Sequence, residues 1–190
     1  MTKSFHQARL RPAALLAAFA GFLILTAGTA LSGPNALQDV QDDVARRWPA
    51  LTHLPAAKLS ELMAANTVAL FDVREEAEFE VSHIAGAVRV DPGITREDFL
   101  ARFGTAAKDK NAVFYCSVGV RSSKLATRVA DDLKAGGAKE VFDLAGGIFA
   151  WHRDERPLTD AKGPTQFVHP NSKSWGSVLS RPELLRMEPR

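Results

Sequence analysis

From Ala56 onward, short apolar runs alternate with longer stretches in which apolar residues recur every three or four positions. A short apolar run bounded by turn residues is typical of a buried strand, and the longer period is typical of a helix with one apolar face. Alternating strands and helices build a mainly parallel sheet, because each helix lets the chain re-enter the sheet in the same direction. The sequence therefore predicts an α/β domain. Strands are expected at residues 68–73, 87–90, 112–116 and 140–144, and helices at 58–65, 75–81, 95–103, 121–135 and 147–153.

The helix expected at 121–135 has a clear apolar face. Leu125, Val129 and Leu133 recur every four residues, while lysine, arginine and aspartate occupy the other side. Two glycines at 136–137 supply a stop signal. We expect this helix to pack on the sheet.

The N-terminus has the composition of an export signal. Residues 1–12 contain three lysine or arginine residues and no acidic residue, and residues 13–31 carry no charge. A helix over 13–31 would be roughly 28 Å long at about 1.5 Å per residue, close to the thickness of the hydrocarbon core of a membrane. Residues 1–32 are therefore expected to be a signal peptide or a membrane anchor.

Both fates of this segment stay open at the sequence level. Small residues at 30 and 32 offer a cleavage site, and an uncleaved 13–31 helix would tether the protein to the inner membrane. Either fate places the rest of the chain across the membrane, because the positive charge stays on the cytoplasmic side. In a bacterium, this predicts a periplasmic location.

The remainder of the chain divides into three parts. Residues 33–50 are expected to be a linker with a short helix at 36–47, and residues 51–158 form the domain. Prolines recur through residues 159–190, which are therefore expected to be a largely irregular tail, with Trp175 among its anchors.

Charge and motif content exclude several classes of function. Charged residues make up 24% of the chain, but the formal net charge is only +2, so no basic face for nucleic acid stands out. The five histidines and the one cysteine lack the short ligand spacings of metal sites. Phosphate-loop and dinucleotide fingerprints are absent from the sequence as well. We expect no nucleic-acid partner, no metal and no cofactor.

A strand, a short loop and a helix follow one another around Cys116, the single cysteine. The apolar strand ends at Cys116, and residues 117–121 lead directly into the amphipathic helix. Successive backbone N–H groups of a tight loop, together with the positive end of a helix, make a site for an anion. A thiol at such a site ionises easily, because the site favours the thiolate. We assign Cys116 as the catalytic residue.

The loop and the start of the helix are expected to hold the substrate. Gly119 permits backbone conformations that a side chain would resist, and Arg121 could pair with an oxyanion. The expected substrate-binding residues are Ser117, Val118, Gly119, Val120, Arg121 and Ser122. In the structural alternative, Cys116 is only a small buried residue and Arg121 a solvated helix residue. The position of Cys116 at the mouth of the loop favours the reactive interpretation.

Four segments, in order, resemble the rhodanese (sulfurtransferase) family. YCSVGVRSSKLA at 115–126 is similar to the family's active-site loop. DVREEAEF at 72–79 and HIAGA at 83–87 resemble its first signature, and LAGGIFAW at 144–151 resembles its closing segment. The resemblance covers residues 51–158. It implies a rhodanese-like fold, with a central, mainly parallel, five-stranded sheet flanked by helices on both faces.

The resemblance also implies a reaction. The Cys116 thiolate takes a sulfur atom from a small thiosulfate-like anion, forms a persulfide and passes the sulfur to an external thiol, to cyanide or to a protein acceptor. The chain has no second cysteine for an internal disulfide, so the acceptor must come from outside.

Supporting roles follow from the same resemblance. Asp72 and Arg74 are expected to form a partly buried ion-pair network that braces the loops near the cysteine. His83, Glu78 and the glycines at 146–147 are interpreted as scaffold.

The chain departs from the family pattern at three positions. Ser82 and Ala85 stand where the family usually has glycine and proline, which affects a turn. Ser117 stands where many thiosulfate-using members carry a basic residue, so the identity of the donor stays open.

Two other functions fit parts of the pattern. Phosphatases and arsenate reductases of a related type also surround an oxyanion with a cysteine loop and an arginine, but they have five residues in the loop, and only four separate Cys116 from Arg121. The other alternative is a membrane-tethered binding or regulatory module without turnover.

Overall fold

The computed structural model describes residues 35–190, except for the side chains of residues 173 and 174. The signal peptide or anchor expected at residues 1–32 therefore lies outside the described residues. Among the helices of residues 35–190, none combines the length and the apolar character that a membrane crossing requires.

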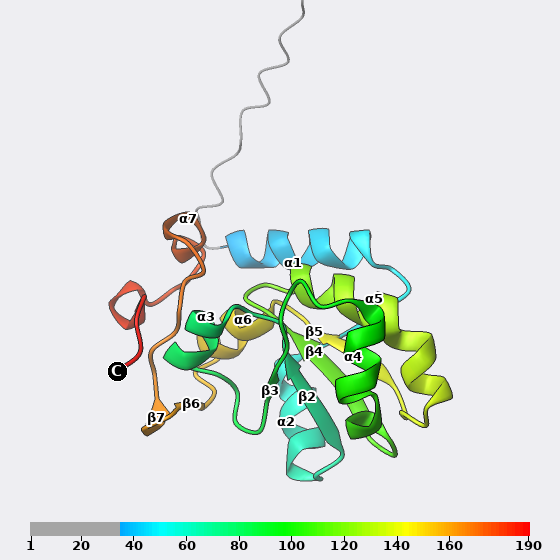
Figure 1. Ribbon diagram of the computed structural model, residues 1–190. Helices are drawn as coiled ribbons and strands as arrows, with labels where there is room; N and C mark the ends of the chain where they lie inside the picture. The colour runs from blue at the N-terminus through cyan, green and yellow to red at the C-terminus, as the bar shows by residue number, and fades with distance from the viewer. Residues whose placement is uncertain (1–34) are drawn as a thin grey trace, which may run out of the picture. The chain divides into compact units, whose positions relative to one another are not determined.

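Five parallel strands form the central sheet, in the order β1-β5-β4-β2-β3 (Figure 1). The strands are β1 (Thr52–Leu54), β2 (Val68–Asp72), β3 (Val88–Arg89), β4 (Asn111–Tyr115) and β5 (Val141–Leu144). The predicted α/β class and the five-stranded parallel sheet are confirmed. Because the strands run in one direction, their carboxyl ends share one edge of the sheet, and β4 ends there directly before Cys116.

The six predicted helices are present, with ends that agree to within two residues. The helices and 3-10 turns are α1 (Ala36–Arg47), α2 (Ala56–Ala64), α3 (Glu76–Val81), α4 (Arg96–Phe103), η1 (Gly104–Ala107), α5 (Val120–Ala135), α6 (Gly147–Arg153), α7 (Lys173–Gly176) and η2 (Pro182–Leu184). The stop signal after α5 operates as expected, since the helix ends at Ala135 and Gly137 has a φ of +97°.

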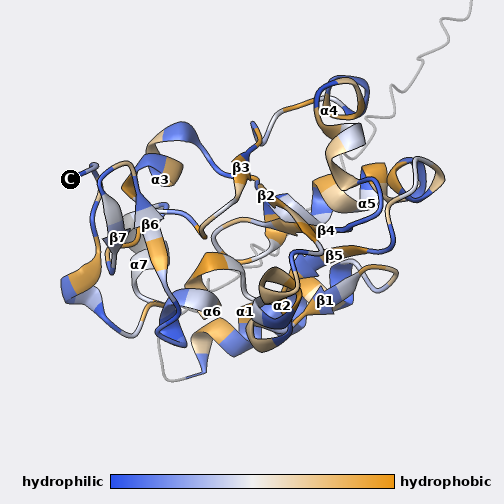
Figure 2. Cartoon of the chain, turned by 90° about the horizontal axis from the view of Figure 1, so that it is seen from below, coloured by the Kyte–Doolittle hydropathy of each residue, from blue (hydrophilic) through white to orange (hydrophobic). Residues whose placement is uncertain are grey.

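One face of the sheet is covered by α4 and α5. Alternate strand residues point to opposite faces, and on this face Phe71 and Phe114 contact Phe99 of α4 through their rings. Leu125 and Val129 of α5 belong to the same cluster. The two helices lie together in Figure 1, and Figure 2 shows the mixture of hydrophobic and hydrophilic residues along α5. The apolar stripe read from the sequence is therefore the face that packs on the sheet.

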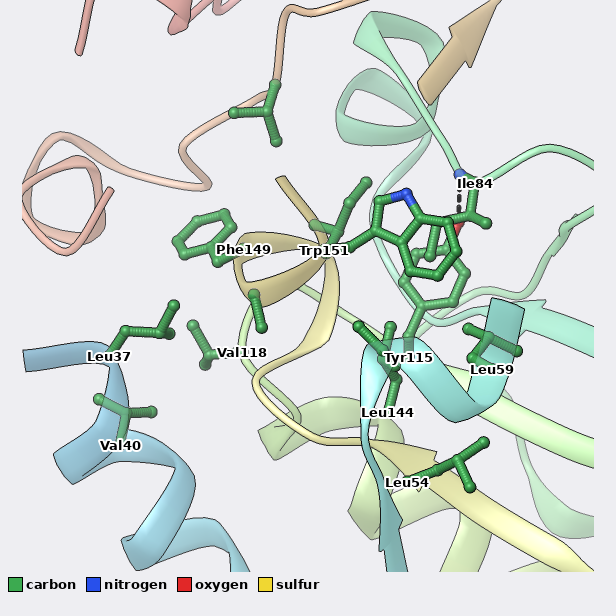
Figure 3. Close-up of a cluster of buried hydrophobic side chains, with 14 of the residues drawn as sticks. Leu37, Val40, Leu54, Leu59, Ile84, Tyr115, Val118, Leu144, Phe149 and Trp151 are labelled. Carbon is green, nitrogen blue, oxygen red and sulfur yellow. Dashed lines mark hydrogen bonds between the residues drawn. The ribbon is translucent and has the colours of Figure 1, made fainter. Parts of the chain in front are cut away.

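A second cluster joins Leu70, Val113 and Leu144 of the strands to α1, α2 and α6. Figure 3 shows Leu37 and Val40 of α1 on the side of this cluster that holds Val118 and Phe149. At the centre of the cluster Tyr115 is fully buried, and its hydroxyl accepts a hydrogen bond of 3.1 Å from the backbone N–H of Ile84. The sheet is thus covered by helices on both faces.

The segments on either side of the domain also contribute to the core. In the stretch expected to be a linker, α1 buries Leu37, Val40 and Val44 in the second cluster. Residues 159–190, called the C-terminal segment below, contain α7, η2, the strand β7 (Gly163–Thr165) and most of β6 (Leu158–Asp160), with which β7 pairs antiparallel. Val168, Val178 and Leu179 of this segment are buried in the second cluster, and Trp175 packs against it.

Candidate functional site

The thiol of Cys116 lies at the carboxyl end of β4, under a short loop that opens α5. Its residue is only 1% exposed, and the backbone N–H of Gly119 donates to Sγ over 3.2 Å. Gly119 has a φ of +105°, a conformation that L side chains rarely adopt. The sequence-predicted combination of strand end, tight loop and helix start is therefore present around the sulfur. The amide and the positive end of α5 both favour a negative charge there.

The start of α6 is hydrogen-bonded to the loop that follows β4. The backbone N–H groups of Ile148 and Phe149 donate to the carbonyl oxygens of Cys116 (2.9 Å) and Ser117 (3.1 Å). A Cβ on Gly147 would lie 2.3 Å from the Cys116 carbonyl oxygen. The scaffold role expected of this glycine thus has a physical cause, which is the close approach of two backbones.

Arg121 is bound to Glu78, a residue that the sequence indicated only as scaffold. Two charge-assisted hydrogen bonds join the guanidinium to the carboxylate, at 2.7 and 2.9 Å. The hydroxyl of Ser117 also donates to Glu78 over 2.9 Å and accepts from Arg121 over 3.0 Å. Glu78 is 2% exposed. Arg121, expected to face an oxyanion, is therefore already paired within the protein.

The charges of this group are fixed by their mutual contacts. Burial opposes the ionisation of Glu78, but hydrogen bonding and charge from Arg121, with a further contribution from Arg74, lower its pKa to about 2. Burial also opposes the charge of Arg121, yet Glu78 and the adjacent Cys116 raise its pKa above the usual range. The guanidinium therefore lies close to the sulfur of Cys116.

Asp72 and Arg74 form a fully buried ion pair at the end of β2. Arg74 donates to both carboxylate oxygens, at 2.8 and 2.6 Å, and to the carbonyl oxygen of Ser82 at 2.7 Å. Burial opposes the charge of Arg74, but Asp72 outweighs it and keeps the pKa of the guanidinium above its ordinary value. The guanidinium also lies over the ring of Tyr115, the residue before the cysteine. This pair connects the end of β2 to the end of β4.

Asp143 is a buried neighbour of the loop that sequence reasoning missed. It lies on β5, and its Oδ2 would be only 3.0 Å from a Cβ placed on Gly119. Burial raises its pKa, while His53, Ser122 and Ser123 favour its charged form. Ser122, expected to contact substrate, is fully buried beside this carboxylate. The signal available in the sequence was an acidic residue inside the apolar strand 141–144.

A pocket of about 220 Å³ opens on the thiol. Its lining residues are Cys116, Ser117, Val118, Val120, Arg121, Asn171 and Trp175. Four of the six predicted substrate-binding residues are among them; Gly119 and Ser122 are not. Asn171 and Trp175 come from the C-terminal segment and were not predicted as site residues. A larger pocket of about 600 Å³ lies between α6 and the C-terminal segment, but it contains no nucleophilic thiol, so we place the site at Cys116.

The remaining sequence candidates lie apart from this pocket. The ring of His83 stacks on Phe79 at 3.9 Å, and its Nδ1 lies 3.0 Å from the Phe79 carbonyl oxygen. Within residues 35–190, no group of three or more metal-ligating side chains is present. The Cys116 thiol, which lines the small pocket, is placed to act as a nucleophile.

Comparisons with known sequences agree with this geometry. Residues 55–154 match the rhodanese-like domain. The chain is 32% identical over 119 residues to the probable adenylyltransferase/sulfurtransferase MoeZ of Mycobacterium tuberculosis, covering 62% of this chain and 29% of MoeZ. It is 29% identical over 120 residues to the tRNA uridine(34) hydroxylase of Staphylococcus saprophyticus, covering 61% and 36%. The matched part spans about a third of the length of these relatives.

Two solved structures share the architecture. A thiosulfate sulfurtransferase from Pseudomonas aeruginosa superposes with a TM-score of 0.52 at 17% identity, over 75% of this chain and 26% of that one. An As-Sb reductase from Leishmania major superposes with a TM-score of 0.50 at 26% identity, over 58% of this chain and 86% of that one. At 17% identity, the first similarity shows the fold alone.

Proposed function

The chain belongs to the rhodanese-like family, and on that premise we propose that it is a sulfurtransferase whose Cys116 carries sulfur as a persulfide. The observation that carries the proposal is the placement of the Cys116 sulfur in a pocket of about 220 Å³, next to the Gly119 amide and the start of α5. A sulfur atom added to Sγ would extend into this pocket. The same groups that favour the thiolate then favour the terminal charge of the persulfide.

In the first half of the cycle, the Cys116 thiolate attacks the outer sulfur of a thiosulfate-like donor. A bond forms between the two sulfurs, and the bond between the outer sulfur and the sulfonyl group breaks. For thiosulfate the leaving group is sulfite, which departs with the electron pair. The products are a Cys116 persulfide anion and sulfite, so charge and atoms balance without a redox cofactor.

In the second half, an acceptor thiolate or cyanide attacks the terminal sulfur of the persulfide. The Cys116 thiolate leaves and is restored, and the acceptor departs as a persulfide or as thiocyanate. This order of events is covalent catalysis with ping-pong kinetics. With one cysteine in the chain, the acceptor is an external molecule.

The similarity to an As-Sb reductase makes oxyanion reduction the second candidate. That chemistry requires Arg121 to hold a tetrahedral oxyanion, but Arg121 is bonded to Glu78 by both of its outer nitrogens. The loop between Cys116 and Arg121 also has four residues, one fewer than the loop of the phosphatases and arsenate reductases considered above. A binding module without turnover is the remaining alternative.

Steady-state turnover tests the proposal and both alternatives. The purified protein is supplied with thiosulfate or another sulfane donor and with cyanide, and thiocyanate is measured. We expect parallel double-reciprocal plots and no thiocyanate from Cys116→Ser. Arsenate reduction or aryl phosphate hydrolysis that depends on Cys116, without sulfur transfer, would support the oxyanion enzyme instead. No activity of any of these kinds would support the binding module.

We also propose that the protein is exported, with residues 1–32 as its signal or inner-membrane anchor. The support is the basic start and uncharged stretch of the sequence. Fusion of residues 1–35 to alkaline phosphatase, an enzyme active only outside the cytoplasm, is expected to give active reporter. An inactive fusion, beside an active fusion to a known signal peptide, would overturn export.

A further inference from the structure

Two residues that line the Cys116 pocket come from beyond the family match. The match ends at residue 154, whereas Asn171 and Trp175 belong to the C-terminal segment. We propose that this segment completes the pocket and selects a donor whose sulfane sulfur is carried on an organic, apolar group. The inference rests on the proposed sulfur transfer and adds the class of donor.

The C-terminal segment is fixed in place beside the loop. Val168 is fully buried, and backbone hydrogen bonds join it to Leu184 (3.0 Å) and Arg186 (3.1 Å). Asn171 donates through its amide to Glu78 over 3.3 Å, and its own N–H donates to Nδ1 of His169 over 3.0 Å. Asn171 therefore attaches the segment to the carboxylate that holds Arg121.

The wall that the segment supplies is aromatic. Trp175 is the one aromatic residue among those that line the pocket, and the aliphatic side chains of Val118 and Val120 line it as well. Trp175 also packs against the second hydrophobic cluster, so its position is supported by the core. An apolar group that enters the pocket removes its surface and that of these three side chains from water, which favours binding.

Charge in the pocket favours the same class of donor. Arg121 is the one cation among the lining residues, and Glu78 compensates it. Burial lowers the pKa of the neighbouring His169, which therefore adds no positive charge at neutral pH. Thiosulfate brings two negative charges to a site that already holds a thiolate. An organic thiosulfonate brings only one, so it meets less repulsion.

The corresponding reaction balances. The Cys116 thiolate attacks the outer sulfur of R–SO₂–S⁻, the new sulfur–sulfur bond forms, and the bond from that sulfur to the sulfonyl group breaks. The organic group R leaves as the sulfinate R–SO₂⁻, with the electron pair. The enzyme keeps the persulfide anion, and no oxidant or reductant is consumed.

Single-turnover kinetics with two donors test the role of Trp175. Persulfide formation on the purified protein is followed by intact mass with benzenethiosulfonate and with thiosulfate, at concentrations below saturation. We expect Trp175→Ala to slow the reaction of benzenethiosulfonate roughly tenfold and that of thiosulfate less than about twofold. Trp175→Phe keeps an aromatic wall and is expected to retain the wild-type ratio of the two rates within about threefold.

Phe167→Ala is the matched control, because Phe167 is a half-buried aromatic residue of the same segment that does not line the Cys116 pocket. It is expected to leave both rates unchanged. Equal rate losses for the two donors in Trp175→Ala, or no loss for either, would overturn donor selection while leaving sulfur transfer intact. Failure of the wild-type protein to form a persulfide with either donor would overturn the proposed function itself.

Discussion

Glu78 connects three segments that are distant in sequence. It lies on α3, binds Arg121 and Ser117 of the loop, and accepts a hydrogen bond from Asn171 of the C-terminal segment. The carboxylate is buried, so each of these bonds replaces a bond to water that folding removes. Glu78 is therefore the residue on which the position of Arg121 depends.

Glu78→Gln is expected to destabilise the protein by about 2 kcal/mol. The change leaves Arg121 without its counter-charge, and the cost is below the value of about 3–5 kcal/mol for a fully buried pair because the Arg121 side chain is 25% exposed. Urea unfolding measures the effect. Glu76→Gln on the same helix, whose side chain is 72% exposed, is the control and is expected to change stability by less than about 0.5 kcal/mol. Equal effects of the two changes would contradict the role of Glu78.

The same carboxylate predicts a dependence of stability on pH. Its pKa is about 2 in the folded protein against an ordinary value of 4.5, so the ionised form stabilises the fold. This contribution is fully present above about pH 4.5 and is lost as the pH falls toward 2. The difference in the free energy of unfolding between wild type and Glu78→Gln should be constant near neutral pH and shrink below about pH 4.5. A difference in the free energy of unfolding that stays constant down to acid pH would contradict the lowered pKa of Glu78.

Gly147 gives a prediction about backbone packing. An alanine there would place its Cβ 2.3 Å from the Cys116 carbonyl oxygen, so the loop and α6 must separate. We expect a loss of about 2–4 kcal/mol in stability and slower persulfide formation. Gly86 has a similarly positive φ of +79° but free space around it. Gly86→Ala should therefore cost only the backbone strain, about 1–2 kcal/mol, with the rate of persulfide formation unchanged. Similar effects on that rate would contradict the contact between α6 and the loop.

At the residue scale, local patterns single out Cys116 as the proposed nucleophile but do not reveal the residues that contact its loop. The loop itself could be predicted because a strand end, a glycine and a helix start are local features. The contacts between Glu78 and Arg121, and between Asp143 and Gly119, join residues that local patterns do not relate. They depend on how the sheet aligns its strands, which a pattern within one segment does not show.

At the scale of elements, α1 is part of the folded core. Val44 is 1% exposed, and its Cγ1 would lie 3.3 Å from a Cβ on Gly119. Val44→Ala is expected to cost about 2 kcal/mol through lost burial and the cavity that remains. Arg46→Ala on the same helix, with a side chain 72% exposed, should change stability by less than about 0.5 kcal/mol. Urea unfolding of both variants decides whether α1 stabilises the domain, since a negligible effect of Val44→Ala would mean that it does not.

Helices α1 to α6 and four strands of the central sheet could be predicted because their patterns extend over enough residues. The strand β1 could not be located, since it has three residues of mixed polarity. The packing of α1 and of the C-terminal segment also escaped prediction. Their buried residues, such as Val40 and Val168, contact residues that are far away in the sequence, and a local pattern does not reveal such contacts.

At the scale of the whole molecule, the residues of the candidate site lie at one edge of the parallel sheet, where the strands have their carboxyl ends. β2 ends at Asp72 of the Asp72–Arg74 pair, β4 ends directly before Cys116, and β5 carries Asp143 next to the loop. The C-terminal segment then adds Asn171 and Trp175 to the pocket at the thiol. A parallel arrangement brings these segments together because all carboxyl ends lie on one side.

Intact mass of the protein after exposure to a sulfane donor tests the central claim most directly. We predict a gain of the mass of one sulfur atom, located on Cys116, absent from Cys116→Ser and removed by cyanide or a thiol with recovery of the original mass. No gain with thiosulfate, with an organic thiosulfonate or with an organic persulfide would contradict sulfur transfer through Cys116.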